Sequence, residues 1–171
     1  MYEVYKRSLE HLNFKASHDE LTGVYNRAGY DLLLESIDLK STYMILFDVD
    51  NFKSINDTYG HETGDKVLIK LVQVLKNNFR DDDYICRIGG DEFVVFMVHA
   101  SEKQNHLIAQ KLDSINRELG TPGDGLPPTS ISVGITHGSE ADGTDNLFEK
   151  ADAAMYDSKR KGKRSYTFAK K

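Results

Sequence analysis

The residues best suited to chemistry lie in two acidic segments, each of which interrupts an apolar run. Asp48 and Asp50 end one run, and Asp91 and Glu92 divide another. Side chains two apart in a strand share a face, so we expect Asp48 and Asp50 to lie together at a strand end. Neighbouring carboxylates repel one another unless they are protonated or bridged by a cation, and their hard oxygens suit Mg²⁺. If the second segment lies beside that strand end, three or four carboxylates form a candidate metal site.

Gly89 and Gly90 stand immediately before the second acidic pair. Glycine accepts positive φ, which predicts a tight antiparallel hairpin between the strands YICRI and FVVFMV. Glycines also let a phosphate-bearing ligand approach the backbone. Taken singly, an acidic strand end or an acidic turn is more often ordinary solvent-facing structure, so neither segment alone establishes a site.

Apolar periodicity predicts the elements that position these acids. The runs STYMILFDVD and TSISVGIT are typical of strands, and SYTF of a short edge strand. Helical spacing predicts helices over the ranges 5–12, 26–36, 67–79, 107–119 and 144–161. This order favours an α+β sheet with the hairpin at its centre and helices packed against it.

Composition restricts the function classes. A chain of 171 residues is long enough for one domain, and its net charge of −5 argues against a nucleic-acid partner. Its single cysteine, Cys86, excludes an internal disulfide and is better explained by packing than by nucleophilic chemistry. No apolar run is long enough to span a membrane, so we expect a cytoplasmic domain.

The first residues carry a narrow apolar stripe, formed by Tyr5, Leu9 and Leu12 at helical spacing. We interpret residues 1–17 as a stalk or linker helix whose stripe could pair with a partner stalk. The chain is then one module of a longer parent protein, with a sensory or other domain attached and with a membrane anchor as one option.

Several motifs in order resemble the GGDEF family of diguanylate cyclases. FDVDNFKSINDTYGHETGDKVL begins at Phe47 and is followed by RIGGDEF, while DELTGVYNRAGY, SVGI and ADAAMYDSKRKGKR resemble the family's first motif, late strand and final helix. The resemblance implies a GGDEF domain over residues 18–171. It also implies an antiparallel, palm-like sheet related to nucleotidyl cyclases, with a hairpin carrying the signature motif and flanking helices.

The family's reaction supplies roles for the acids. The resemblance implies that two GTP molecules, held on two facing domains of a homodimer, condense to cyclic di-GMP and two pyrophosphates. Asp48 and Asp91 are then the carboxylate ligands of two Mg²⁺ or Mn²⁺ ions per site, with the carbonyl of Val49 as a backbone ligand. Asp91 also helps to deprotonate the attacking hydroxyl, and Glu92 supports the site.

Guanine specificity is assigned to Asn56 and Asp65 by the same resemblance. Guanine presents two adjacent donors, N1–H and the N2 amine, which match an acceptor-only carboxylate such as Asp65. Adenine has no donor at N1, so a buried carboxylate opposite it is left unpaired. Asn56 both donates and accepts and is the second guanine contact. Without the resemblance, both residues would be assigned to turns and helix starts.

Phosphate binding is assigned to backbone amides and lysines. The amides lie near Asn51 and Phe52, and the lysines are Lys53, Lys159 and Lys163. Spacing by four predicts a row on the last helix that changes from buried residues to lysine as it leaves the core.

The last motif departs from the family pattern at two positions, with Ser158 in place of alanine and Lys163 in place of arginine. Lysine keeps the charge but loses the bidentate fork, which predicts weaker phosphate binding. Gly162 also leaves the direction of Lys163 open.

Arg80 and Asp83 form an R-x-x-D motif that resembles the family's product-inhibition site, with cyclic di-GMP as inhibitor. The alternative is a solvated RDDD loop. Two other functions stay open: a catalytically inactive GGDEF module that binds GTP or cyclic di-GMP as a regulatory domain, and an adenylyl cyclase or polymerase-like palm, against which Asn56 and Asp65 argue.

Overall fold

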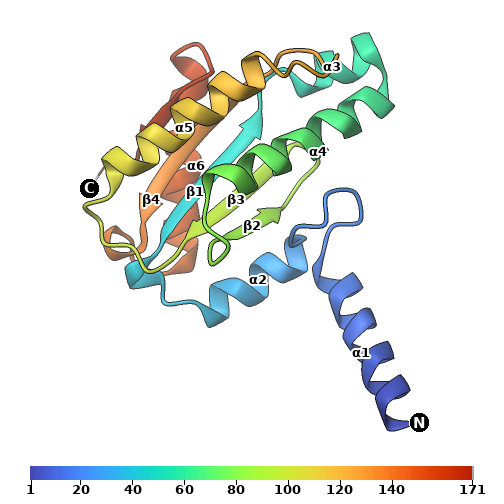
Figure 1. Cartoon of the computed structure of the whole chain (residues 1–171). Helices are drawn as coiled ribbons and strands as arrows, with labels where there is room; N and C mark the ends of the chain where they lie inside the picture. The colour runs from blue at the N-terminus through green and yellow to red at the C-terminus, as the bar shows by residue number, and fades with distance from the viewer. Residues whose placement is uncertain (171) are drawn as a thin grey trace.

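Five apolar segments pair into one mixed sheet in the computed structural model, which describes residues 1–170 (Figure 1). The strand order is β2-β3-β1-β4-β5. The first four strands pair antiparallel, whereas β4 and β5 run parallel. The strands are β1 Tyr43–Val49, β2 Tyr84–Arg87, β3 Glu92–Met97, β4 Ile131–His137 and β5 Tyr166–Phe168.

Residues 1–170 also form six α-helices and two short 3₁₀ turns. They are α1 Tyr2–Ser17, α2 Arg27–Ser36, η1 Leu39–Ser41, α3 Phe52–Tyr59, α4 His61–Asn78, α5 Asn105–Gly120, η2 Gly138–Glu140 and α6 Thr144–Arg160. Each predicted helix and strand is confirmed. Helix α3 was not predicted, because it is short and only Ile55 of its eight residues is buried.

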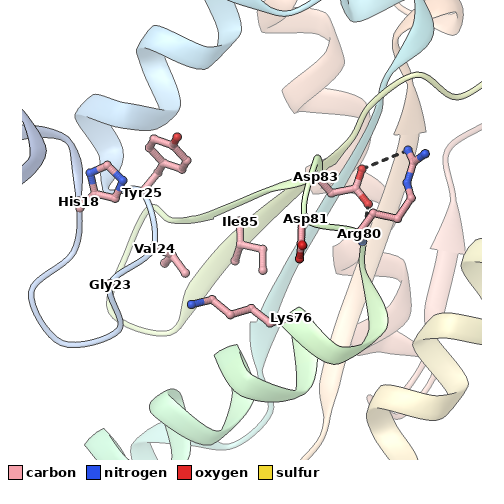
Figure 2. A pocket seen from close by; sticks show the side chains of 9 residues that line it. All are labelled: His18, Gly23, Val24, Tyr25, Lys76, Arg80, Asp81, Asp83 and Ile85. Atoms are coloured by element: carbon pink, nitrogen blue, oxygen red, sulfur yellow. Dashed lines mark hydrogen bonds and ion pairs between the residues drawn. The ribbon is translucent and has the colours of Figure 1, made fainter.

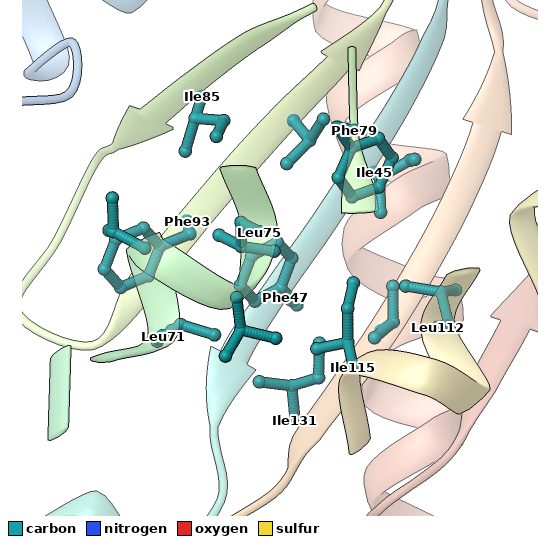
Figure 3. Packing of buried hydrophobic residues seen from close by; sticks show 14 of the residues in the cluster. Ile45, Phe47, Leu71, Leu75, Phe79, Ile85, Phe93, Leu112, Ile115 and Ile131 are labelled. Atoms are coloured by element: carbon teal, nitrogen blue, oxygen red, sulfur yellow. The ribbon is translucent and has the colours of Figure 1, made fainter. Parts of the chain in front are cut away.

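Alternation along β1 divides the core into two layers. Ile45 and Phe47 face the layer that α4 and α5 cover, and Met44 and Leu46 face the layer that α2 and α6 cover. Figure 3 shows the first layer, where the rings of Phe47 and Phe93 stack with centroids 5.7 Å apart. Because β1 is buried on both faces, it is a fixed platform for the acids at its end.

A glycine in β4 brings α6 close to the sheet. A Cβ on Gly134 would overlap the backbone of α6, including the carbonyl oxygen of Ala151. Ser158 then donates a hydrogen bond of 2.6 Å to the carbonyl of Val133, and its hydroxyl lies 2.8 Å from that of Thr167. The serine that replaces the usual alanine therefore ties α6 to both β4 and β5.

The hairpin differs from its prediction in two respects. It lies to one side of the sheet, with β2 at the edge and β1 in the centre, and not at the middle of the sheet. Neither Gly89 nor Gly90 has a positive φ, so the turn does not use that freedom. Its closure depends on Glu92, which lies at the start of β3 and whose carbonyl accepts from the N–H of Ile88 at 2.9 Å.

The N-terminal helix and the cysteine complete the comparison. Helix α1 buries none of its residues and projects from the rest of the molecule (Figure 1). The division into a stalk over 1–17 and a domain over 18–171 stays a prediction: α1 ends at Ser17, and residue 171 lies outside the described residues.

Cys86 is fully buried, which raises the pKa of its thiol to about 12 and agrees with a packing role. None of the helices within residues 1–170 combines the length and the hydropathy that a membrane span requires.

Candidate active site

The end of β1 and the hairpin turn converge, as the sequence predicts. Asp48 is directly opposite Glu92 in the antiparallel pairing of β1 with β3. One residue further along, the N–H of Val49 donates to the carbonyl of Asp91 at 3.1 Å. The strand pairing therefore fixes the two acidic segments side by side.

A lysine from α6 completes this acidic corner. The Lys159 ammonium is in direct ion-pair contact with a carboxylate oxygen of Asp48, and the two side chains are 35% and 17% exposed. Burial disfavours charge on Lys159, but the hydrogen bond and the negative charge of Asp48, with Asp91 and Glu92 nearby, outweigh burial and raise the pKa of that lysine. Lys159 therefore stays protonated and places a positive charge over the acids.

The acids themselves carry more negative charge than the lysine neutralises. Burial raises the pKa of Asp48, and Lys159 does not cancel that effect because Asp91 and Asp50 add repulsion. Burial also raises the pKa of Glu92, with further contributions from Asp152, Asp48 and Asp91. Bound cations would relieve both effects.

Asp50 lies on the same face of the sheet as Asp48, as the alternation predicts. Its N–H continues the pairing of β1 with β4 by donating to the carbonyl of Ser130 at 2.9 Å, and Asp48 is opposite Ser132. The Asp50 carboxylate is buried and accepts hydrogen bonds from the hydroxyls of Ser130 and Ser132, each at 2.6 Å, and from the N–H of Arg164 at 3.0 Å. Asp50 therefore adds negative charge near Asp48 and ties the end of β1 to β4 and to the segment before β5.

The acids at this corner offer the oxygen ligands that a divalent cation prefers. Within residues 1–170, no group of three or more His, Cys, Asp or Glu side chains is arranged around a common point that could hold a metal ion. Asp48 and Asp91 lie on paired segments next to the backbone of Val49, and the charge of Asp91 acts on Asp48. Hard oxygen ligands of this kind suit Mg²⁺ or Mn²⁺, which commonly take substrate phosphates as further ligands. Burial, with repulsion between the acids as a smaller cause, raises the pKa of both Asp48 and Glu92 at this place.

The signature turn leaves its outer side open. A Cβ at Gly90 would meet no atom within 4 Å, and one at Gly89 would meet only the side chain of Glu92. Packing within the protein therefore does not require both glycines. Open space beside the backbone is what a closely approaching ligand needs.

Sequence reasoning missed an arginine that anchors this turn. The Arg87 guanidinium donates to the carbonyl of Gly90 at 2.8 and 3.1 Å and to both carboxylate oxygens of Asp19 at 3.2 Å. Burial opposes ionisation of Asp19, but its hydrogen bonds with Thr22 and the charge of Arg87 lower its pKa. The position of Arg87, two residues before the glycines, was the available signal. Arg87 thus fixes the signature turn to the segment that follows α1.

The two candidate guanine contacts lie on adjacent helices joined by Gly60. Asn56 is in α3 and its Oδ1 is buried without a hydrogen-bond partner in residues 1–170. A Cβ on Gly64 would overlap that same oxygen, so the glycine leaves room for the amide of Asn56. Asp65 follows on α4 and is exposed. The orphaned oxygen lacks an acceptor role within residues 1–170, and a rotation of the Asn56 side chain would be needed to present it to a ligand donor.

The candidate phosphate contacts come from the start of α3 and from the chain after α6. Asn51 has a left-handed backbone with φ of 55°, directly before α3, which places the amides of Phe52 and the following residues at a helix N-terminus. Lys53 is exposed on the same turn.

Lys163 is not on the last helix, contrary to the row predicted from spacing by four. Helix α6 ends at Arg160, and the chain then turns through Gly162 and Lys163, both with positive φ. The turned backbone nevertheless carries the Lys163 ammonium to the side-chain oxygen of Asn51, at 2.6 Å. The lysine therefore lies beside the phosphate segment, although not by the predicted route.

Arg80 and Asp83 border a pocket of about 360 Å³ that lies between α4 and the segment 18–25 (Figure 2). Asp83 is buried and accepts from the backbone N–H groups of Arg80 and Val98, at 3.0 and 3.2 Å. The Arg80 guanidinium donates to the carbonyl of Val98 at 2.6 Å and lies 3.5 Å from Asp83. Asp83 is therefore a buried, ordered part of this turn, whereas Arg80, Asp81 and Asp82 are exposed, and the role of the motif stays a prediction.

Comparison with known proteins places these features in a family. The family described as "Diguanylate cyclase, GGDEF domain" matches residues 16–165. The chain is 37% identical over 146 residues to the probable diguanylate cyclase DgcI of Escherichia coli, covering 85% of this chain and 31% of that protein. It is 31% identical over 163 residues to the diguanylate cyclase DgcS of Shewanella oneidensis, covering 92% of this chain and 54% of that protein. The chain thus spans about a third to a half of the length of these relatives.

Solved structures of GGDEF domains have the same fold as this chain. The coiled coil and GGDEF domain of DgcB from Caulobacter crescentus, in complex with c-di-GMP, aligns with a TM-score of 0.84 at 27% identity, over 98% of this chain and 93% of that one. A microbial GGDEF domain studied for its interaction with cyclic di-GMP aligns with a TM-score of 0.78 at 33% identity, over 92% and 99% of the two chains. The α+β fold and its palm-like sheet are confirmed by these matches.

Proposed function

The chain belongs to the GGDEF domain family of diguanylate cyclases, and from this premise we propose that it condenses two GTP molecules into cyclic di-GMP and two pyrophosphates. The observation that supports this proposal most strongly is the convergence of Asp48 with the turn that carries Asp91, beneath the ammonium of Lys159. Two sites, one on each domain of a homodimer, would each hold one GTP.

The carboxylates of Asp48 and Asp91, with the carbonyl of Val49, would hold two Mg²⁺ or Mn²⁺ ions. Such ions, when bound, lower the pKa of the attacking 3′-hydroxyl and neutralise charge on the leaving pyrophosphate. Asp91, at the open turn, would accept the proton of that hydroxyl. Glu92 is held opposite Asp48 and contributes negative charge that favours cation binding.

The phosphates would be held by positive charge and by amides. Lys159 and Lys163 approach from the end of α6, and Lys53 and the amides of Asn51 and Phe52 approach from the start of α3. Lys159 contacts Asp48, and its ammonium would also meet the triphosphate beside the acids. The helix N-terminus adds a favourable potential for the same anion.

Guanine recognition would come from Asn56 and Asp65. The buried, unpartnered Oδ1 of Asn56 can accept from the base, and the exposed carboxylate of Asp65 can accept two donors from one edge. Adenine lacks that pair of donors. We therefore expect ATP to compete poorly with GTP.

Dimer formation and product inhibition extend the proposal. The stripe of Tyr5, Leu9 and Leu12 on the projecting helix α1 is exposed and suits a partner stalk. Since one product joins two substrates, activity should rise more than linearly with protein concentration. The pocket beside Arg80 and Asp83 is proposed as the inhibitory site for cyclic di-GMP.

The test is to incubate the protein with GTP and Mg²⁺ and to identify the nucleotides formed, alongside Asp91→Asn. The variant should keep its fold and make no cyclic di-GMP. Asp113→Asn, an exposed acid on α5, is the matched control and should retain activity. Turnover by Asp91→Asn would contradict the assignment. A wild-type protein that binds GTP and never releases pyrophosphate would instead favour a catalytically inactive regulatory module.

A further inference from the structure

A second pocket lies on the reverse side of the segment that joins β1 to α3. Its volume is about 380 Å³, and it shares only Asn51 with the proposed nucleotide site. Helix α3, the loop before β4 and the chain after α6 form its walls, with contributions from Ser54, Thr58, Pro128, Thr129 and Arg164. Pockets of about 300 Å³ and above are large enough for a small organic ligand.

Arg164 supplies a positive charge at this pocket. Its backbone has a φ of 46°, and its N–H donates to the carboxylate of Asp50 at 3.0 Å. Its guanidinium lies over Gly120, where a Cβ would come within 2.9 Å of Nη1. The structure records no ion pair to this guanidinium within residues 1–170.

The neighbouring acid makes no ion pair with that guanidinium within residues 1–170. Asp50 also lines the pocket, but its two oxygens already accept from the hydroxyls of Ser130 and Ser132 and from the backbone N–H of Arg164. Asp50 therefore shapes the wall through these three hydrogen bonds. The fork of N–H donors on Arg164 is available for an external oxyanion.

A buried hydroxyl in the same wall has no partner. The Oγ1 of Thr129 is inaccessible to solvent and makes no hydrogen bond within residues 1–170. The backbone N–H of Thr129 is satisfied by the carbonyl of Leu119 at 2.9 Å, so the residue is held in place by its main chain. Because this hydroxyl is inaccessible, Thr129 contributes to the wall of the pocket and not a hydrogen bond to a ligand inside it.

The rest of the wall is suited to an apolar body. Pro127 and Pro128 present rigid surfaces without N–H groups, and Ile55 and Tyr59 of α3 face them across the pocket. Inorganic phosphate would leave this surface uncovered. An aromatic or heterocyclic ring would cover it while a charged group meets Arg164.

We propose that this pocket binds a small organic anion, with a phosphate or carboxylate group on Arg164 and a ring against the two prolines. The two observations that carry the proposal are the guanidinium without an ion pair in residues 1–170 and the apolar wall, which line one cavity. Neither GTP nor metal is needed for this binding.

The experiment titrates phenyl phosphate, benzoate and inorganic phosphate separately into the ¹⁵N-labelled whole chain, without GTP or Mg²⁺. Phenyl phosphate or benzoate should shift the amide signals of Ser54, Thr58, Thr129 and Arg164. Tighter binding of phenyl phosphate would identify a phosphate ester as the preferred ligand, and tighter binding of benzoate would identify a carboxylate. The absence of shifts at these amides with both compounds would overturn the proposal, as would inorganic phosphate binding as tightly as either.

Two variants separate binding in this pocket from general attraction to positive charge. Arg164→Gln should weaken binding about ten-fold, which corresponds to one charge-assisted hydrogen bond. Lys161→Gln removes a nearby exposed cation and should leave binding unchanged. Equal losses from Arg164→Gln and Lys161→Gln would refute the site.

Discussion

Gly64→Ala is expected to impair GTP recognition without weakening the fold. The new Cβ would overlap Oδ1 of Asn56 and would lie 3.0 Å from its Cγ and 3.3 Å from the ring of Phe52. The new Cβ therefore displaces mainly the amide group at the end of the flexible Asn56 side chain. The amide of Asn56 should rotate away from the position that we propose for a guanine contact.

Gly64→Ala should change stability and GTP affinity in opposite directions. Alanine is a better helix former than glycine by about 1 kcal/mol, and Gly64 is inside α4 with an ordinary helical backbone. Stability should therefore be unchanged or slightly higher, because Oδ1 of Asn56 has no hydrogen bond to lose. Loss of one neutral hydrogen bond to the base costs about 0.5–1.5 kcal/mol, or about 2- to 10-fold in GTP affinity.

The assay is calorimetric titration with a non-hydrolysable GTP analogue, together with denaturant unfolding. Asn56→Ala provides the reference loss, and the double variant should bind no worse than Asn56→Ala alone. If Gly64→Ala bound the analogue like the wild type while Asn56→Ala lost affinity, the proposed link between the glycine and the guanine contact would be refuted. A further loss in the double variant would show that Gly64 acts through another residue.

Three other perturbations test separate parts of the structure. Gly134→Ala should destabilise the protein by about 3 kcal/mol or prevent folding, because backbone atoms of α6 cannot yield to the new Cβ as a side chain can; near-wild-type unfolding would contradict that contact. Glu92→Gln should raise the free energy of unfolding at pH 7, since the raised pKa means that ionised Glu92 is less favourable in the folded chain than in the unfolded one. This gain should shrink toward about pH 4, where the unfolded carboxyl is protonated as well; a gain that grows on acidification would reverse the assigned sign. Arg80→Ala should raise the concentration of cyclic di-GMP needed for inhibition, and an identical inhibition curve would remove Arg80 from that role.

The sequence predicted the sheet well because burial leaves a strong local signal. The run that forms β1 is apolar on both faces, and the two strands of the hairpin are separated by only a few residues. Helix α3 was missed because FKSINDTY is mostly polar and its boundaries depend on the backbone at Asn51 and Gly60. A short polar helix between two turns has little periodicity to detect.

The sequence predicted the parts of the site that the pairing of adjacent strands holds together. It predicted less well the contacts between segments that are distant in the chain. Asp48 and the signature turn converge through adjacent strands, as expected. The alternation placed Asp50 beside Asp48 but could not reveal its hydrogen-bond partners Ser130 and Ser132, which lie 80 and 82 residues away. Lys163 reaches Asn51 across 112 residues through a turn that helical spacing cannot describe. Long-range contacts of this kind depend on the folded chain and leave no local pattern.

The most direct test of the central claim is a crystal structure with Mn²⁺ and a non-hydrolysable GTP analogue, in which anomalous scattering locates the metal. We predict manganese bound by the carboxylates of Asp48 and Asp91 and by the triphosphate, with the base at Asn56 and Asp65. Nucleotide bound with manganese away from these carboxylates, or with the oxygens of Asp48 and Asp91 directed apart, would contradict the proposed active site.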